Sequence, residues 1–223
     1  MRKFRLLLLI LLAGVGCVGC LRDGLETIAL PFGKIPNAVI PQEIREQFQQ
    51  YMPIYEGITP PDVTGAYLAS PLQIVFTSDY QFDPGDLFAP QYFAFQDQTA
   101  SGMATYSERQ GSGVSEASEV YIVGSGDNFT AYFISHTTLY DDDGNMVATT
   151  TESNVASGTK TDAGISNYRY AFVMLDKYDP TGIIMAVNDF RVFEDGDGLA
   201  IRYDWAKSVL EEGLEKSVRL KKN

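Results

Sequence analysis

From residue 63 onward, the chain consists of short runs rich in Tyr, Phe, Val, Ile and Thr, separated by groups of Asp, Gly, Asn and Pro. Such runs between turn-forming residues are typical of β-strands. Every connector in the second half of the chain is short, so neighbouring strands are expected to run antiparallel. The predicted strands cover residues 63–70, 72–79, 92–99, 103–110, 117–124, 129–140, 146–155, 167–178, 182–193 and 199–203.

Two flanking segments show helical rather than alternating periodicity. In residues 41–52, apolar side chains recur every three or four positions, and Pro41 suits the first position of a helix. Residues 204–220 repeat this spacing, and Asp204 can cap their amino end. We therefore expect an all-β domain with a short helix at each end.

Some of the predicted strands are apolar on both faces. A strand with one face in water alternates apolar and polar residues, but residues 129–138 and 167–178 do so only in part. Burial on both faces favours an antiparallel up-and-down barrel whose outside is covered by helices or tether; the alternative is a β-sandwich with an oligomer contact. One face of the second strand presents Tyr168, Tyr170, Phe172 and Met174.

The amino-terminal residues have the three-part layout of an export signal. Basic residues in 1–5 precede an aliphatic run in 6–12 and a small-residue stretch that ends at Cys20. The layout resembles the signal of bacterial lipoproteins, in which such a cysteine is acylated and becomes the mature amino terminus. We expect Cys20 to carry the lipid, with Cys17 as the alternative. The expected organisation is a signal peptide over 1–19, a tether over 20–38 and one β domain over 39–223.

Composition excludes several classes of function. Removal of the signal takes three basic residues with it and leaves a net charge of −15, which argues against binding to nucleic acid or to anionic lipid surfaces. The mature chain has no cysteine beyond Cys20, so an apolar core rather than disulfides must stabilise it. His136 is the only histidine, which nearly excludes a zinc site, and neither a G-x-S-x-G motif nor an S-x-x-K arrangement with supporting motifs indicates a catalytic nucleophile.

The acidic turns do not fit a calcium motif. In the two most acidic turns, Leu139 and Phe193 stand where an EF-hand loop needs its first aspartate. Aspartate and glycine are also the residues that tight hairpin turns select. We therefore predict no metal, no cofactor and no enzymatic activity; a pair of carboxylates that converge in space for glycoside hydrolysis stays open, because such a pair needs no sequence spacing.

Taken together, the elements resemble those of lipocalin-like (calycin) envelope lipoproteins. The resemblance lies in the export signal, the first helix, Gly65-Ala66-Tyr67 at the first strand, the antiparallel strands and the terminal helix; Tyr67 occupies the place of the tryptophan in the family's G-x-W motif. It implies a barrel with an internal ligand site, on a lipoprotein of the cell envelope, at the outer membrane of a diderm bacterium.

The predicted function is non-enzymatic binding of a small apolar or amphipathic molecule inside the barrel. Tyr168, Tyr170, Phe172 and Met174 would form an apolar wall, and Tyr132 and His136 would supply polar contacts. The alternative is a structural or accessory surface lipoprotein that binds an envelope protein or a glycan; it predicts an exposed apolar patch in place of a cavity. The expected partners are the membrane, through the lipid, and the small ligand, but no nucleic acid.

Overall fold

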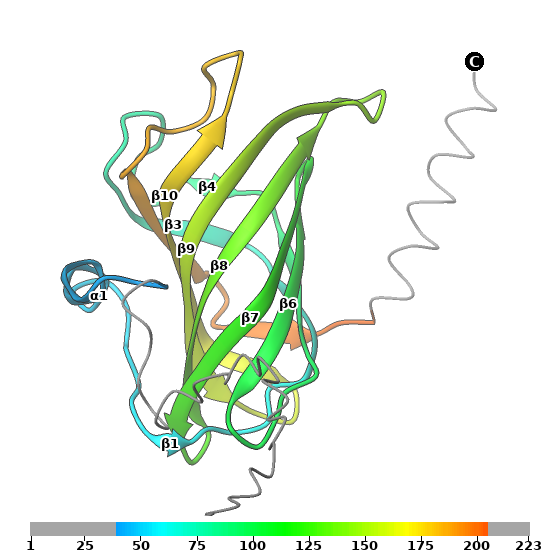
Figure 1. Ribbon diagram of the computed structural model, residues 1–223. Coiled ribbons are helices and arrows are strands. Elements are labelled where there is room, and N and C mark those ends of the chain that lie inside the picture. Colours follow the sequence, from blue (N-terminus) through cyan, green and yellow to red (C-terminus); the bar gives the residue numbers. More distant parts are fainter. Residues whose placement is uncertain (1–38, 205–223) are drawn as a thin grey trace, which may run out of the picture.

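The computed structural model describes residues 39–204, and they fold mainly into antiparallel β-sheet (Figure 1). In this part of the chain one helix, α1 (Gln42–Phe48), precedes the strands. Within the described residues the strands are β1 (Ile58–Thr59), β2 (Gly65–Ala69), β3 (Leu72–Thr77), β4 (Leu87–Phe88), β5 (Gln91–Gln96), β6 (Met103–Gln110), β7 (Gly113–Ser125), β8 (Asn128–Tyr140), β9 (Met146–Lys160), β10 (Gly164–Tyr178), β11 (Phe190–Asp195) and β12 (Leu199–Arg202). The prediction of an all-β domain is confirmed.

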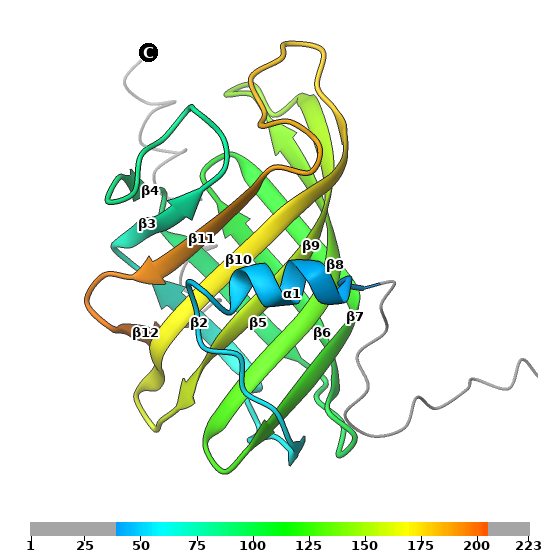
Figure 2. The same cartoon turned by 90° about the vertical axis from the view of Figure 1, so that its left-hand side faces the viewer.

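Eight of these strands form a closed ring of hydrogen-bonded neighbours. Strands β5 to β10 follow one another in sequence order, β2 pairs with β5, and β12 joins β2 to β10. All the strands of the described residues belong to one sheet, rather than to the two sheets of a sandwich. The ring surrounds an interior that runs the length of the domain (Figures 1 and 2).

The long strand β10 changes partner along its length. Gly164 to Ser166 pair with β12, whereas Arg169 to Val173 pair with β11, and the pairing of β10 with β9 shifts between Ser166 and Arg169. At this irregularity Asn167 has φ 52° and donates its N–H to the Gly198 carbonyl. Beyond it, β11, β3 and β4 extend the sheet, so the ring is closed through β12 at one end only.

Glycine is required where β10 meets β12. Gly164 has φ +156°, and a Cβ atom at this position would lie 2.1 Å from the carbonyl oxygen of Ala200. A side chain would therefore push the two strands apart at the pairing that closes the ring.

The closed end of the ring is filled with aromatic side chains. Phe93 stacks on Tyr168 with 4.7 Å between ring centroids and lies 5.4 Å from Tyr67. The Tyr67 hydroxyl donates to the Val63 carbonyl at 2.8 Å, and the guanidinium of Arg202 lies 5.8 Å from the Tyr67 ring. Each fully buried aromatic side chain contributes about 1.5–3 kcal/mol of burial free energy, so this end is a packed core.

The outer face of the ring is covered by α1, which crosses β8, β9 and β10 (Figure 2). Phe48 is fully buried and lies 5.6 Å from the Phe190 ring. The Ser153 hydroxyl donates to the Val39 carbonyl at 2.5 Å and fixes the chain just before the helix. Strands β8 and β10 are therefore buried on both faces, by α1 on the outside of the ring and by the aromatic core on the inside.

Several element boundaries differ from the sequence-based expectation. The helix ends at Phe48 rather than at residue 52, with Pro41 as its N-cap residue. The strand predicted over residues 182–193 is wrong before Phe190, because residues 179–189 form a loop around the Asp179 carboxylate. The signal peptide, the tether and the carboxy-terminal helix lie outside the described residues.

Candidate functional site

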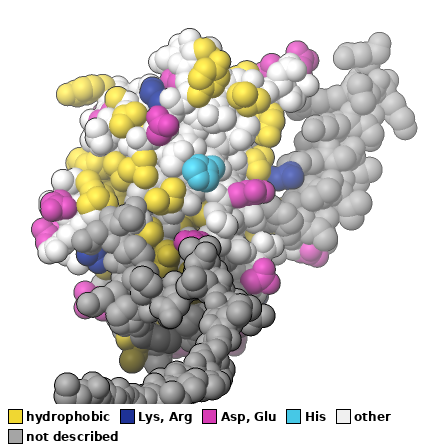
Figure 3. All heavy atoms as spheres, in the orientation of Figure 1, with side chains coloured by type: hydrophobic (Ala, Val, Ile, Leu, Met, Phe, Trp, Pro, Cys, Tyr) yellow, Lys and Arg dark blue, Asp and Glu magenta, His cyan; other side chains and the backbone are white. Residues whose placement is uncertain are grey.

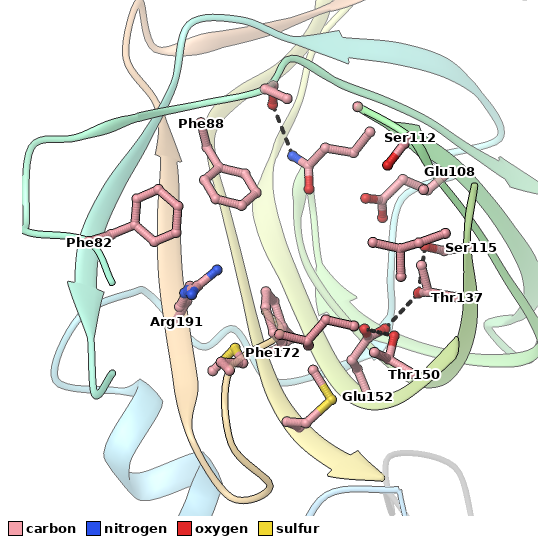
Figure 4. Close-up of a pocket in the computed structure, with 18 of the residues that line it drawn as sticks. Phe82, Phe88, Glu108, Ser112, Ser115, Thr137, Thr150, Glu152, Phe172 and Arg191 are labelled. Atoms are coloured by element: carbon pink, nitrogen blue, oxygen red, sulfur yellow. Dashed lines mark hydrogen bonds between the residues drawn. The ribbon is translucent and has the colours of Figure 1, made fainter. Parts of the chain in front are cut away.

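A pocket of about 530 Å³ opens at the end of the ring that β12 does not close (Figure 4). Its walls come from the inner faces of β6 to β10, from β4 and β11, and from residues 81–82 and 183–185. This volume falls within the range of small-molecule sites. Below the pocket lies the aromatic core described above.

One side of the pocket is apolar and aromatic. Phe82 and Phe88 meet edge to face at 5.3 Å, and Phe88 lies 5.2 Å from Phe193. Phe172 stacks on the same Phe193 at 6.1 Å, and Met174 follows it on the inner face of β10. Figure 4 shows Phe82, Phe88 and Phe172 around Arg191. These rings make a preformed surface for an apolar group.

The cation on this side, Arg191, is held by protein groups. Its Nε donates to Asp79 Oδ2 at 2.6 Å and its Nη2 donates to Gln81 Oε1 at 3.1 Å, while its guanidinium lies 4.7 Å from the Phe82 ring. Burial opposes ionisation of Asp79, but the Arg191 guanidinium and the Thr77 hydroxyl lower the pKa of this carboxyl below its usual value. The pair is therefore ionised, and Asp79 balances the charge of Arg191.

The opposite side of the pocket is polar and carries Glu152, which is 9% exposed. The Ser135 and Thr137 hydroxyls donate to Glu152 Oε2 at 2.9 and 2.8 Å, and the Thr150 hydroxyl donates to Oε1. The Thr137 hydroxyl has one proton and donates it to a hydrogen bond with Glu152. The Ser115 hydroxyl is therefore the donor in the 2.8 Å hydrogen bond between Ser115 and Thr137. Ser135, Thr137 and Thr150 thus direct their protons to the carboxylate, and Ser115 supports this set through Thr137.

A second carboxyl group, Glu108, lines the same pocket and is only 4% exposed. Its pKa is raised to about 7, mainly by burial and also by the nearby Glu152 carboxylate, while hydrogen bonds from Tyr106 and Gln91 work in the opposite direction. The Tyr106 hydroxyl donates to Glu108 Oε2 at 2.5 Å. Near neutral pH this group is therefore divided between its acid and carboxylate forms.

Tyrosine hydroxyls connect the pocket to the core. Tyr170 donates to Asn154 Oδ1 at 2.6 Å, and Tyr168 donates to Gln91 Oε1 at 3.1 Å. Burial raises the pKa of both tyrosines well above the usual value, and the Glu108 carboxylate adds to this effect. Both phenols therefore stay neutral and act as hydrogen-bond donors that fix the inner wall.

The mouth of the pocket is shaped by the loop over residues 179–189. Burial opposes ionisation of Asp179, but hydrogen bonds from the Ile184 N–H, Lys177 and Thr181 lower its pKa to about 2. The Gln81 amide donates to the Ile183 carbonyl at 3.0 Å and joins this loop to the segment after β3. Leu87 and Ile183 line the pocket and are 67% and 66% exposed, so its entrance is apolar.

The structure brings three of the predicted wall residues to the pocket. Tyr170, Phe172 and Met174 line it, on the shared face of β10 that the alternation indicates. Tyr168 lies on the same face, but it is buried in the aromatic core and does not line the pocket.

Tyr132 and His136 are not part of this site, and the expectation that they face the same ligand as the wall is corrected. On β8, Phe133 points inward, so Tyr132 and His136 point outward. Tyr132 is buried beneath α1, where a separate polar hollow of about 550 Å³ lies, and burial raises its pKa. His136 is exposed (cyan in Figure 3), and its Nδ1 lies 3.2 Å from the Thr151 hydroxyl.

The strand pattern did not identify the charged residues of the pocket, namely Glu108, Glu152 and Arg191. Glu108 had a usable signal, because strand alternation places it on the same face as Ala104 and Tyr106, which are apolar positions. A carboxylate on the buried face of a strand indicates a functional or paired group.

Comparisons with known proteins identify no relative, so a function can be proposed only from the geometry of the site. No protein-family model, no curated protein and no solved structure matches the chain. Among residues 39–204, no cluster of three or more His, Cys, Asp or Glu side chains is arranged to hold a metal ion. In the same part of the chain, no helix is both long and apolar enough to cross a membrane.

Proposed function

We propose that this protein is a lipocalin-like envelope lipoprotein that binds a small apolar or amphipathic molecule in the open end of its ring of strands, without catalysing a reaction. The observation that carries the proposal is the pocket of about 530 Å³, with an aromatic wall on one side and a hydrogen-bonded polar wall on the other. A site that opposes an apolar surface to a few convergent polar groups suits an amphipathic guest.

The aromatic wall supplies the binding surface. Phe82, Phe88 and Phe172 pack against one another or against Phe193, so they are ordered before a ligand arrives. Preorganised rings bind an apolar group without the entropic cost of ordering side chains. The exposed apolar residues at the mouth, Leu87 and Ile183, extend this surface to the entrance.

The polar groups of the pocket support binding rather than catalysis. Arg191 is paired with Asp79, and the oxygens of Glu152 accept hydrogen bonds from three hydroxyls. Groups that protein hydrogen bonds hold in this way keep a fixed arrangement of charges in the pocket wall. The lipid expected at Cys20 would keep the pocket at an envelope membrane, with the outer membrane of a diderm bacterium as the proposed location.

Binding of a neutral fluorescent naphthylamine tests the proposal. We expect the purified full-length protein to bind N-phenyl-1-naphthylamine saturably, and Phe172→Ala to weaken binding about tenfold, which corresponds to about half the burial free energy of one aromatic side chain. Tyr178→Ala, an exposed aromatic on the same strand outside the pocket, is the matched control and should bind like the wild type. Non-saturable binding, or equal affinity of all three proteins, would refute the proposed site.

A further inference from the structure

The polar wall of the pocket carries negative charge that no cation in the wall balances. Glu108 on β6 and Glu152 on β9 both face the cavity. Among the described residues that line it, Arg191 alone carries a permanent positive charge, and that charge is paired with Asp79 at 2.6 Å. The side chains of this pair are only 7% and 5% exposed, so the pair is a fixed part of the wall.

The hydrogen-bond network keeps Glu152 in place as an acceptor. Ser135, Thr137 and Thr150 approach it from β8 and β9 and do not neutralise its charge. A buried carboxylate that is held by neutral hydroxyls attracts a cation strongly, because few water molecules screen it. An anionic group in the same place would meet two carboxyl groups instead.

We propose that the pocket selects amphiphiles with an ammonium head group, which lies against Glu108 and Glu152 while the apolar part packs on Phe82, Phe88 and Phe172. This inference rests on the proposed function and adds the chemical class of the ligand. The two walls face each other across one cavity, so a single short amphiphile spans both. The rise in the pKa of Glu108 caused by its burial agrees with it, because an ammonium group at this position returns the carboxyl to its ionised form.

Three amphiphiles with the same chain and different heads test the inference. Decylammonium, decanol and decyl sulfate, each below its micelle concentration, are titrated against the protein loaded with the neutral naphthylamine. We expect decylammonium to displace the probe at about tenfold lower concentration than decanol, and decyl sulfate to be the weakest of the three. Glu152→Gln should reduce the preference for decylammonium over decyl sulfate by about tenfold, and Glu108→Gln should reduce it in the same direction.

The controls separate a head-group effect from a folding effect. Glu116→Gln removes a carboxylate from the exposed outer face of β7 and should keep the wild-type preference. The readout is the ratio between the two charged amphiphiles, which a general loosening of the pocket does not change. Equal displacement by all three amphiphiles, or stronger displacement by the sulfate, would overturn this inference and leave the proposed function standing. Failure of the naphthylamine itself to bind would overturn both.

Discussion

Replacement of Glu108 by glutamine should remove a measurable part of the pH dependence of folding. Glu108 is almost fully buried, and its pKa is raised, mainly by this burial, to about 7 from the ordinary value of 4.5. In the unfolded chain the carboxyl is in water and returns to the lower value. The folded protein therefore holds a proton on this group over a pH range in which the unfolded chain has lost it.

The sign and size of the effect follow from this difference. A group whose pKa is raised on folding stabilises the protein fully below its unfolded pKa, and this stabilisation is lost as the pH rises through the folded pKa. A difference of two to three pKa units at about 1.4 kcal/mol each gives about 3 kcal/mol. Between pH 4.5 and pH 8, the Glu108 contribution to the free energy of unfolding should fall by about this amount.

Urea denaturation of the wild type and of Glu108→Gln, repeated between pH 4.5 and pH 8, measures the difference directly. The buried carboxyl of Asp195, whose pKa burial also raises to about 7, adds a loss of the same sign to both proteins and cancels in the difference. We expect the stability of the wild type to fall relative to that of the variant as the pH rises. If the free energies of unfolding of the two proteins change in parallel over this pH range, the pKa of Glu108 is not raised by folding, and the prediction is refuted.

Two further predictions concern the anchor and the closure of the ring. Cys20→Ser should abolish incorporation of labelled palmitate in cells, whereas Cys17→Ser should not; the opposite result would move the lipid to Cys17. Gly164→Ala should lower the free energy of unfolding by about 3 kcal/mol, because of its positive φ and the contact of the new Cβ atom with β12. Gly126→Ala, at a positive φ in open space, should lower the free energy of unfolding by only about 1 kcal/mol. Urea denaturation measures both variants, and equal losses of stability would show that the contact with β12 is unimportant.

The fold class was predictable because it depends on local patterns. Strand β6 has the bounds that its alternation indicates, and Phe129, Ala131 and Phe133 lie together on one face of β8, as strand alternation requires. The length of β9 was underestimated, because the strand continues beyond residue 155 through Ser157 and Gly158, which are buried but lack the apolar signal of a strand. They are buried where β9 pairs with β8 and β10, and the local sequence does not show these pairings.

The pocket was only partly predictable, because it depends on pairings between distant segments. Alternation on β10 identifies the wall residues, but it does not distinguish Tyr168 in the core from Phe172 at the cavity. The Arg191–Asp79 pair joins residues more than a hundred positions apart, and each lies in a run that reads as an ordinary strand. Tyr132 and His136 share a face, as the alternation requires, yet the pattern alone does not say which face is inside.

The inner faces of the strands explain why one end of the ring is hollow. Along β8, the inward positions change from Phe129 and Phe133 to Ser135 and Thr137, and β7 and β9 present Ser115 and Thr150 at the same level. These smaller side chains fill less of the interior. Beside them β10 pairs with β11 instead of β12, so the ring of strands is open at this end. The short hydroxyl side chains leave space for the cavity, and they also hold the Glu152 carboxylate through hydrogen bonds. The change from aromatic to hydroxyl residues along the strands therefore both creates the cavity and determines its charge.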